Sequence, residues 1–289
     1  MQRIALFKQA WLITWHHKAL WAISLFGSVA FFVYDALFRP KPTEEIIFII
    51  NWAVYVIVLF LTTAFVSGAL MILVNSIADH ETITLGGGFR AGLRWVLPLT
   101  LMTIILMLPV WLILYNPAGT LLTIFADKFA APDSVPVTGL LNNSRFISVS
   151  PYGFILAVTL VTNGIGIGAE RSVVLESRSI LVALKRGVQL LIKRIGDFLV
   201  VGLVLLGFGL VISAIFLSIT GPLVEALALL LGEGALPLYF TSPMGLLFTV
   251  ADFLICAVFT VFASSVWTLA FREWQKQEQG GLAIATEQH

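Results

Sequence analysis

Charged residues are scarce in this chain. Of its 289 residues, 11% are charged and 59% are hydrophobic, whereas soluble domains carry about 25% charged residues. A soluble protein of this composition would leave a large apolar surface in water, so the composition favours a membrane protein. The formal net charge of +1 also excludes the overall positive field that attracts nucleic acid, and we expect no nucleic-acid partner.

Cysteine and the familiar catalytic motifs are also lacking. The single cysteine, Cys256, excludes an intrachain disulfide and a multi-cysteine metal site, and its apolar surroundings predict a small buried side chain. The run Gly86-Gly87-Gly88 is not followed by the Lys-Ser or Lys-Thr of a phosphate-binding loop, and no HExxH or GxSxG motif occurs. We therefore expect no enzyme, no cofactor and no metal site.

Long apolar runs dominate the chain instead. A helix that crosses a bilayer needs about 20 predominantly apolar residues. Six stretches fit, at residues 19–36, 46–77, 95–115, 152–175, 198–220 and 245–271. They predict an all-α polytopic membrane protein with a single six-helix transmembrane domain over residues 1–274. The polar residues 275–289 predict a disordered cytoplasmic tail.

A basic amphipathic stretch, residues 178–195, separates the fourth and fifth predicted spans. At about 100° per residue on a helix, one arc carries cations and the opposite arc is apolar, a pattern typical of a helix that lies flat on a membrane surface. We expect the cations of this arc to bind anionic lipid headgroups: Arg178, Lys185, Arg186 and Lys193.

Similar stretches precede the first and third predicted spans. Each stretch contains the same short motif: a bulky apolar residue, then a cation, then a small residue two positions after the cation. The motif occurs in Phe7-Lys8-Gln9-Ala10, Phe89-Arg90-Ala91-Gly92 and Leu184-Lys185-Arg186-Gly187. The same alignment places His16-His17 opposite Lys193-Arg194. The repetition predicts three hairpins in a ring-like bundle, each preceded by a cytoplasmic interfacial amphipathic helix. The alternative is that entries to membrane helices resemble one another without true repetition.

Small residues recur at four-residue spacing in the second and fourth predicted spans. The pairs are Ala64-x-x-x-Gly68 and Gly164-x-x-x-Gly168. Membrane helices associate where small side chains allow close backbone approach. These four residues therefore predict helix packing, either inside the bundle or, alternatively, in a dimer interface.

Two polar residues fall deep in predicted spans. A charge at the bilayer centre costs at least about 2.5 kcal/mol, so such residues are functional candidates. Asn163 and Asp252 would form an intramembrane polar site in a proton- or cation-coupled transporter. The alternative is that Asp252 reaches interfacial water and Asn163 bonds to a neighbouring backbone.

Two segments carry a family resemblance, AWLITWHHKALWAISLFGSVAFF (10–32) and AERSVVLESRSILVALKRGVQLLIKRIGDFLVVGLVLL (169–206). The second resembles bacterial six-helix membrane proteins, similar to the membrane domain that is fused to some glycerophosphodiester phosphodiesterases. The resemblance implies a fold and supplies no catalytic residues, and we expect no phosphodiesterase domain here.

These patterns together predict a non-catalytic integral membrane protein. It would act as a lipid-associated scaffold or as an accessory subunit of a membrane assembly, with anionic membrane lipids and other membrane subunits as partners. The alternative is a small-solute or lipid transporter whose path runs through the three-hairpin bundle.

The basic residues predict the orientation. Thirteen of the 17 lysines and arginines fall in the termini and in alternate connections, and only Arg39, Lys41, Lys128 and Arg145 fall on the other side. Because cytoplasmic connections carry the excess of Lys and Arg, both termini should be cytoplasmic, in the plasma membrane of a bacterium, and residues 116–151 should face outward.

A cysteine at Ser134 tests this orientation. With Cys256→Ser as background, Ser134→Cys should react with a membrane-impermeant thiol reagent in intact cells, because residues 116–151 are expected outside. A cysteine at Ala285, in the tail, should react only after the cells are permeabilised. The reverse labelling pattern would contradict the orientation.

Overall fold

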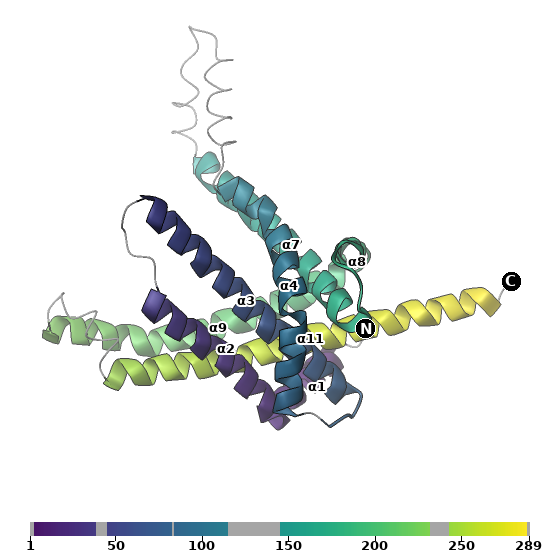
Figure 1. The fold of residues 1–289 in the computed structure, drawn as a ribbon, viewed down its shortest axis with the longest axis horizontal. Helices are drawn as coiled ribbons and strands as arrows, with labels where there is room; N and C mark the ends of the chain where they lie inside the picture. The colour runs from purple at the N-terminus through teal and green to yellow at the C-terminus, as the bar shows by residue number, and fades with distance from the viewer. Residues whose placement is uncertain (1–2, 39–44, 83, 115–144, 232–242, 288–289) are drawn as a thin grey trace, which may run out of the picture.

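The computed structural model describes residues 3–38, 45–82, 84–114, 145–231 and 243–287. Over these residues the chain forms α-helices and no strands, so the all-α prediction is confirmed there. The helices are α1 (Arg3–His16), α2 (Lys18–Phe38), α3 (Glu45–Ala78), α4 (Leu85–Leu114), α7 (Arg145–Glu176), α8 (Ile180–Lys193), α9 (Ile195–Leu231) and α11 (Pro243–Glu287) (Figure 1).

Among the residues that the structure describes, four helices are long and apolar enough to cross a membrane. The qualifying segments are Ala53–Ala78, Leu85–Pro109, Ile195–Thr220 and Phe248–Gln279. The helices α1 and α2 qualify only as a pair, bent by 78°, which raises the number to five. Four to five such helices indicate a multi-pass integral membrane protein.

The first and third repeat units have the same local structure. Both α1 and α8 contain 14 residues, and a single residue separates each of them from the helix that follows. At the two junctions, the His17 N–H donates to the Ile13 carbonyl (3.2 Å) and the Arg194 N–H donates to the Leu190 carbonyl (2.9 Å). The alignment of His16-His17 with Lys193-Arg194 therefore corresponds to a shared helix break.

The second unit differs from the prediction. Residues 85–94 are the first turns of α4 and not a separate interfacial helix. The reason is a continuous contact with α3. A Cβ added at Gly68 would lie 3.2 Å from both Trp95 Cβ and Leu99 Cδ1, and 3.9 Å from Gly92 Cα. These three residues share one face of a single helix, so an uninterrupted α4 keeps all three contacts.

Each amphipathic segment packs closely on a long helix. A Cβ at Gly187 of α8 would lie 3.0 Å from Ala169 N of α7, and closer still to Ile165 O. A Cβ at Gly92 of α4 would lie 2.9 Å from Phe65 O of α3. Both glycines thus allow backbone-to-backbone contact. In α1 the equivalent residue is Ala10, which is fully buried, and α1 packs on α11.

The predicted packing residues all lie at contacts within this chain. Gly68 faces α4. Gly168 lies against Gly187, because a Cβ added at Gly168 would be 3.1 Å from Gly187 Cα. Gly164 faces Leu191 of α8, and Ala64 is 4% exposed in an apolar cluster shared by α3, α4, α7 and α8.

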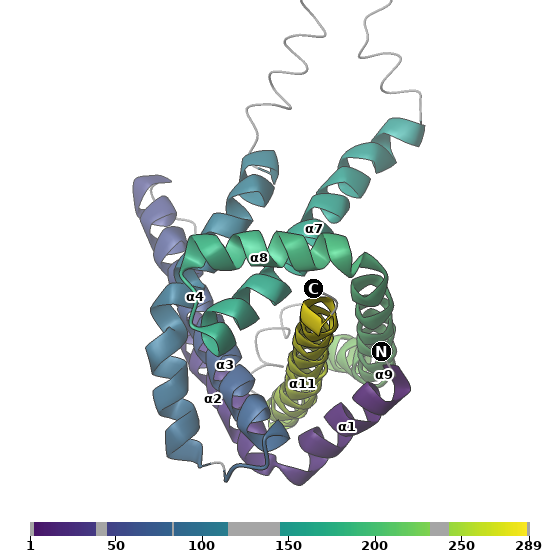
Figure 2. The ribbon, with the colours of Figure 1, turned by 90° about the vertical axis from the view of Figure 1, so that its right-hand side faces the viewer.

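The helix α11 lies at the centre of the molecule. It contacts α1, α2, α3, α7 and α9, and Figure 2 shows α1, α4 and α8 on three sides of it. Its Phe271 and Trp274 side chains are fully buried. The Trp274 ring lies 4.8 Å from that of Phe198 at the start of α9. The principal apolar core is therefore built around α11.

The prediction of a disordered tail over 275–289 is wrong as far as Glu287, because α11 continues to that residue. Two polar contacts hold the start of this segment in place. The Gln275 amide donates to Glu176 Oε1 (2.7 Å), and Glu278 pairs with Arg186 of α8. Sequence periodicity cannot reveal such long-range partners.

Gly187→Ala tests the backbone contact between α7 and α8. Because the new methyl group would overlap Ile165 O, we expect a loss of about 1–3 kcal/mol in unfolding free energy, measured by thermal unfolding in detergent. The control is Gly202→Ala, where an added Cβ meets no atom within 4 Å. That change should be neutral or stabilising by about 0.5–1 kcal/mol. Equal effects of the two substitutions would contradict the contact.

Candidate functional site

The best candidate site lies where α1, the first turns of α4 and α8 surround α11 (Figure 2); we call this part of the molecule the ring end. The three repeat units present the same chemistry here. Their cations, Lys8, Arg90 and Lys185, are all exposed. The bulky residues that precede them pack partly buried against the two apolar clusters: Phe7, Phe89 and Leu184.

The four predicted headgroup ligands are not equivalent in the structure. Lys185 and Lys193 are exposed. Arg178 precedes α8, and its Nε lies 2.5 Å from Glu176 Oε2, a close charge pair that lacks hydrogen-bond geometry. The Arg186 side chain is 15% exposed and pairs with Glu278. Two of the four cations therefore point away from the protein, and two are engaged within it.

The outward face of α8 combines apolar residues with lysine. Leu181 and Ile192 are 77% and 70% exposed, and Val188 is also exposed. Lys185 lies on the same helix face, four residues after Leu181 and three before Val188, and Ile192 follows Val188 by four residues. The inward face consists of small or apolar residues: Ala183, Gly187 and Leu190. Such a helix inserts its apolar residues among lipid chains while the lysine reaches toward the headgroups.

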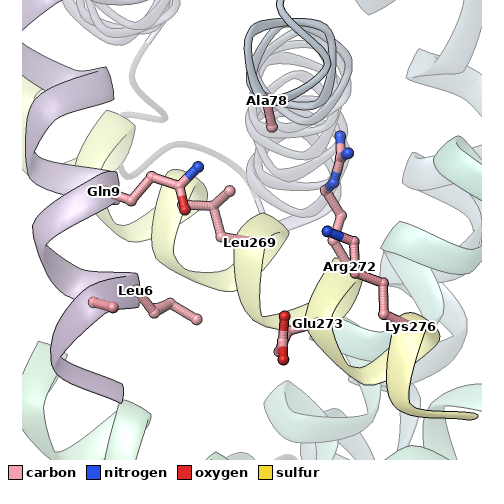
Figure 3. Close-up of a pocket in the computed structure, with 8 residues that line it drawn as sticks. Leu6, Gln9, Ala78, Leu269, Arg272, Glu273 and Lys276 are labelled. Carbon is pink, nitrogen blue, oxygen red and sulfur yellow. The ribbon is translucent and has the colours of Figure 1, made fainter. Parts of the chain in front are cut away.

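A polar cavity of about 270 Å³ lies between α1, the end of α3 and α11. Figure 3 shows Gln9 of α1 across from Leu269 of α11, with Arg272 directed toward the end of α3. An Arg272 N–H group (Nη1) donates to both the carbonyl and the side-chain oxygen of Asn75 (2.9 Å each), and Arg272 also pairs with Asp79. The lining residues are Ala5, Leu6, Gln9, Ala78, Leu269, Arg272, Glu273 and Lys276.

A second cavity, of about 640 Å³, shares Gln9 and Ala78 with the first. Its polar lining includes His16, His17, His80 and Glu81. Burial, and to a lesser extent the neighbouring His16, lowers the pKa of His17. Among the described residues, no group of three or more His, Cys, Asp or Glu side chains is arranged to hold a metal ion.

His80 adopts a backbone conformation that usually belongs to glycine. Its φ is 60°. The hydrogen bonds from His80 N–H to Ile77 O (3.0 Å) and from Glu81 N–H to Ser76 O (2.9 Å) form a Schellman motif that ends α3. The motif satisfies the terminal carbonyls of α3 and fixes His80 beside the second cavity.

The structure does not bring Asn163 and Asp252 together at any described cavity. Asn163 is exposed on α7 and donates to Thr159 O of its own helix (2.9 Å). Asp252 lies 3.8 Å from the Cys256 thiol, one turn away on α11. Cys256 is exposed, so its prediction as a buried residue is wrong.

Sequence reasoning missed the polar connections made by α11. Arg272 bonds to residues almost 200 positions earlier, and Glu278 bonds across 92 positions. Each of these side chains looks like a solvated charge when read in its local sequence. The one local signal is the spacing of Asn75 and Asp79, which are four residues apart and therefore share a helix face. Both of their side chains bond to Arg272.

Comparisons of the chain with protein-family models, curated proteins and solved structures found no match.

The Asp79–Arg272 pair predicts a pH-dependent stability. The hydrogen bond from Arg272 is the main cause that lowers the pKa of Asp79, and the charges of Arg272, Lys276 and His80 add to it. Because the folded-state pKa lies below the unfolded value of about 3.9, the stabilisation is complete above about pH 4. It is lost as the pH falls through the lowered folded-state pKa.

Asp79→Asn should therefore lower the thermal unfolding temperature at pH 7. Below pH 4, the unfolding temperature of this variant should fall less steeply with decreasing pH than that of the native protein. Unfolding in detergent across this pH range measures both effects. Glu273→Gln, which removes a carboxylate from the same cavity and leaves the pair intact, is the control. A decline in Asp79→Asn as steep as that of the control would contradict the assignment.

Proposed function

We propose that this chain is a non-catalytic integral membrane protein that binds anionic lipid headgroups at the ring end and serves as a scaffold or accessory subunit of a membrane assembly. One observation carries the proposal. The equivalent cations of the three repeat units, Lys8, Arg90 and Lys185, are all exposed on the segments that surround α11.

The proposal includes a finer architecture of six membrane helices. The helices pair as three hairpins, α2 with α3, α4 with α7, and α9 with α11, and the two members of each pair are in contact. In this arrangement α2 and α7 also cross the bilayer, and the ring end faces the cytoplasm. The excess of basic residues in the connections of that end supports this orientation.

Electrostatics favours anionic headgroups as the ligand. Each cation near an anionic membrane surface contributes about 1 kcal/mol, an attraction that fades within a Debye length of about 8–10 Å. Lys193, also exposed, adds to Lys185 on α8. The apolar side chains beside Lys185 hold α8 in the interface, so the lysine needs no protein partner there.

The exposure of α9 supports the role as an accessory subunit. Within its most apolar window, 17% of the α9 span is buried inside the chain, against 50% for the α11 span. The remaining apolar surface is available to lipid or to another membrane subunit.

A charge-removing triple variant tests the headgroup proposal. Lys8→Gln, Arg90→Gln and Lys185→Gln together should weaken binding of short-chain phosphatidylglycerol to the detergent-solubilised protein on the order of 100-fold at low salt, since three contributions of about 1 kcal/mol are lost. The dependence of affinity on salt concentration should also become shallower.

Two controls accompany this measurement. The charge-conserving triple Lys8→Arg, Arg90→Lys and Lys185→Arg should bind like the native protein, and short-chain phosphatidylcholine should not distinguish the variants. Unchanged affinity and unchanged salt dependence in a correctly folded charge-removing variant would refute the proposal.

A further inference from the structure

A third cavity, of about 220 Å³, lies among α2, α3 and α11. Six of its nine lining residues carry hydroxyl groups: Ser24, Ser28, Thr62, Thr63, Ser67 and Thr260. The other three are Gly27, Leu59 and Val66. No ionisable side chain is among these nine residues. Single serines and threonines in apolar helices attract little notice in a sequence, but here three helices direct them into one space.

This cavity is an open recess along apolar helices, and two of its lining residues, Thr63 and Thr260, are exposed. Its α3 and α11 residues fall within the membrane-crossing segments Ala53–Ala78 and Phe248–Gln279. Thr260 precedes Leu269, which lines the first cavity at the ring end, by nine residues. At 1.5 Å per residue the hydroxyl-lined cavity is therefore about 13 Å deeper along α11.

Three of the hydroxyl groups are oriented as acceptors. Ser28 donates to Ser24 O (3.2 Å), Thr62 to Val58 O (2.6 Å) and Thr63 to Leu59 O (2.8 Å). Because each uses its proton on its own helix, its oxygen lone pairs remain available to a ligand.

Ser24 provides an independent sign of a ligand. It is 3% exposed, it lines the cavity, and its hydroxyl has no hydrogen-bond partner among the described residues. This hydroxyl is free to donate and to accept toward the cavity that it lines.

We propose that this cavity is a binding site for a short neutral polyol. The site offers both acceptors and a free donor, which matches hydroxyl groups that themselves donate and accept. Leu59 and Val66 provide apolar surface for the carbon chain. A charged solute would lose its hydration with no counter-charge in the lining, at high cost inside a membrane.

The volume of the cavity admits a small ligand. At roughly 30 Å³ per water molecule, 220 Å³ corresponds to the space of about seven waters. A triol with six non-hydrogen atoms, such as glycerol, fits this space. This solute site is separate from the headgroup contacts at the ring end and extends the function proposed above.

Saturation-transfer NMR with the detergent-purified full chain tests the proposal, with glycerol as probe and glycerate as its charged counterpart. The buffer must contain no other polyol, and the detergent no sugar headgroup. Glycerol should show binding and glycerate none. Absence of glycerol binding, or equal binding of glycerate, would overturn the proposal.

Two cavity variants locate the binding. Ser24→Ala and Thr62→Val should each weaken glycerol binding about 2- to 10-fold, as expected for one lost hydrogen bond. Thr103→Val is the matched control, because Thr103 makes the same i to i−4 bond on α4 (2.9 Å to Leu99 O) and does not line the cavity. Equal effects of Thr62→Val and Thr103→Val would overturn the location.

A labelling measurement decides the location if the cavity variants fail to fold. In a Cys256→Ser background, Ser67→Cys should react with the small neutral reagent methyl methanethiosulfonate, and glycerol should slow this reaction at least 3-fold while glycerate should not. A rate unaffected by glycerol would overturn the proposal.

Discussion

Close backbone contact at small residues is the interaction on which the rest of the fold depends. At Gly187 and Gly92 an added methyl group would lie within 3 Å of a carbonyl oxygen on the preceding long helix. Helices that approach this closely gain dispersion contacts along both backbones, and in a membrane such contacts replace the missing hydrophobic driving force. The amphipathic segments are therefore fixed across α3 and α7, and their cations are fixed with them.

Much of this arrangement could be predicted from the sequence. Apolar runs located the long helices, because the bilayer imposes length and composition on every span. The repeat motif located the small residues at the helix crossings and the helix breaks at His17 and Arg194. Sequence failed at α4, where a contact with Gly68 keeps residues 85–114 in one helix. It also failed at the end of α11, where Glu278 pairs with Arg186 and Gln275 donates to Glu176.

The candidate sites show the same division. Charge counting identified the exposed lysines of α8, because that signal is local. It could not separate Lys185 from Arg186, because one residue turns the side chain by about 100°, from an exposed position to one paired with Glu278. The hydroxyl-lined cavity had no visible signal, because Ser24, Thr62 and Thr260 lie on three helices. Their convergence arises from the packing of α2, α3 and α11 around one another.

The central position of α11 has a consequence for how the chain assembles. Chains are synthesised from the N-terminus, and α11 follows every other helix described here. The buried face of α1, with Leu6, Ala10 and Ile13, lacks its main packing partner until α11 is in place. The helices formed earlier are thus left open on the side that α11 fills. During that interval the apolar and small-residue faces that α11 later covers are the surfaces most open to wrong contacts.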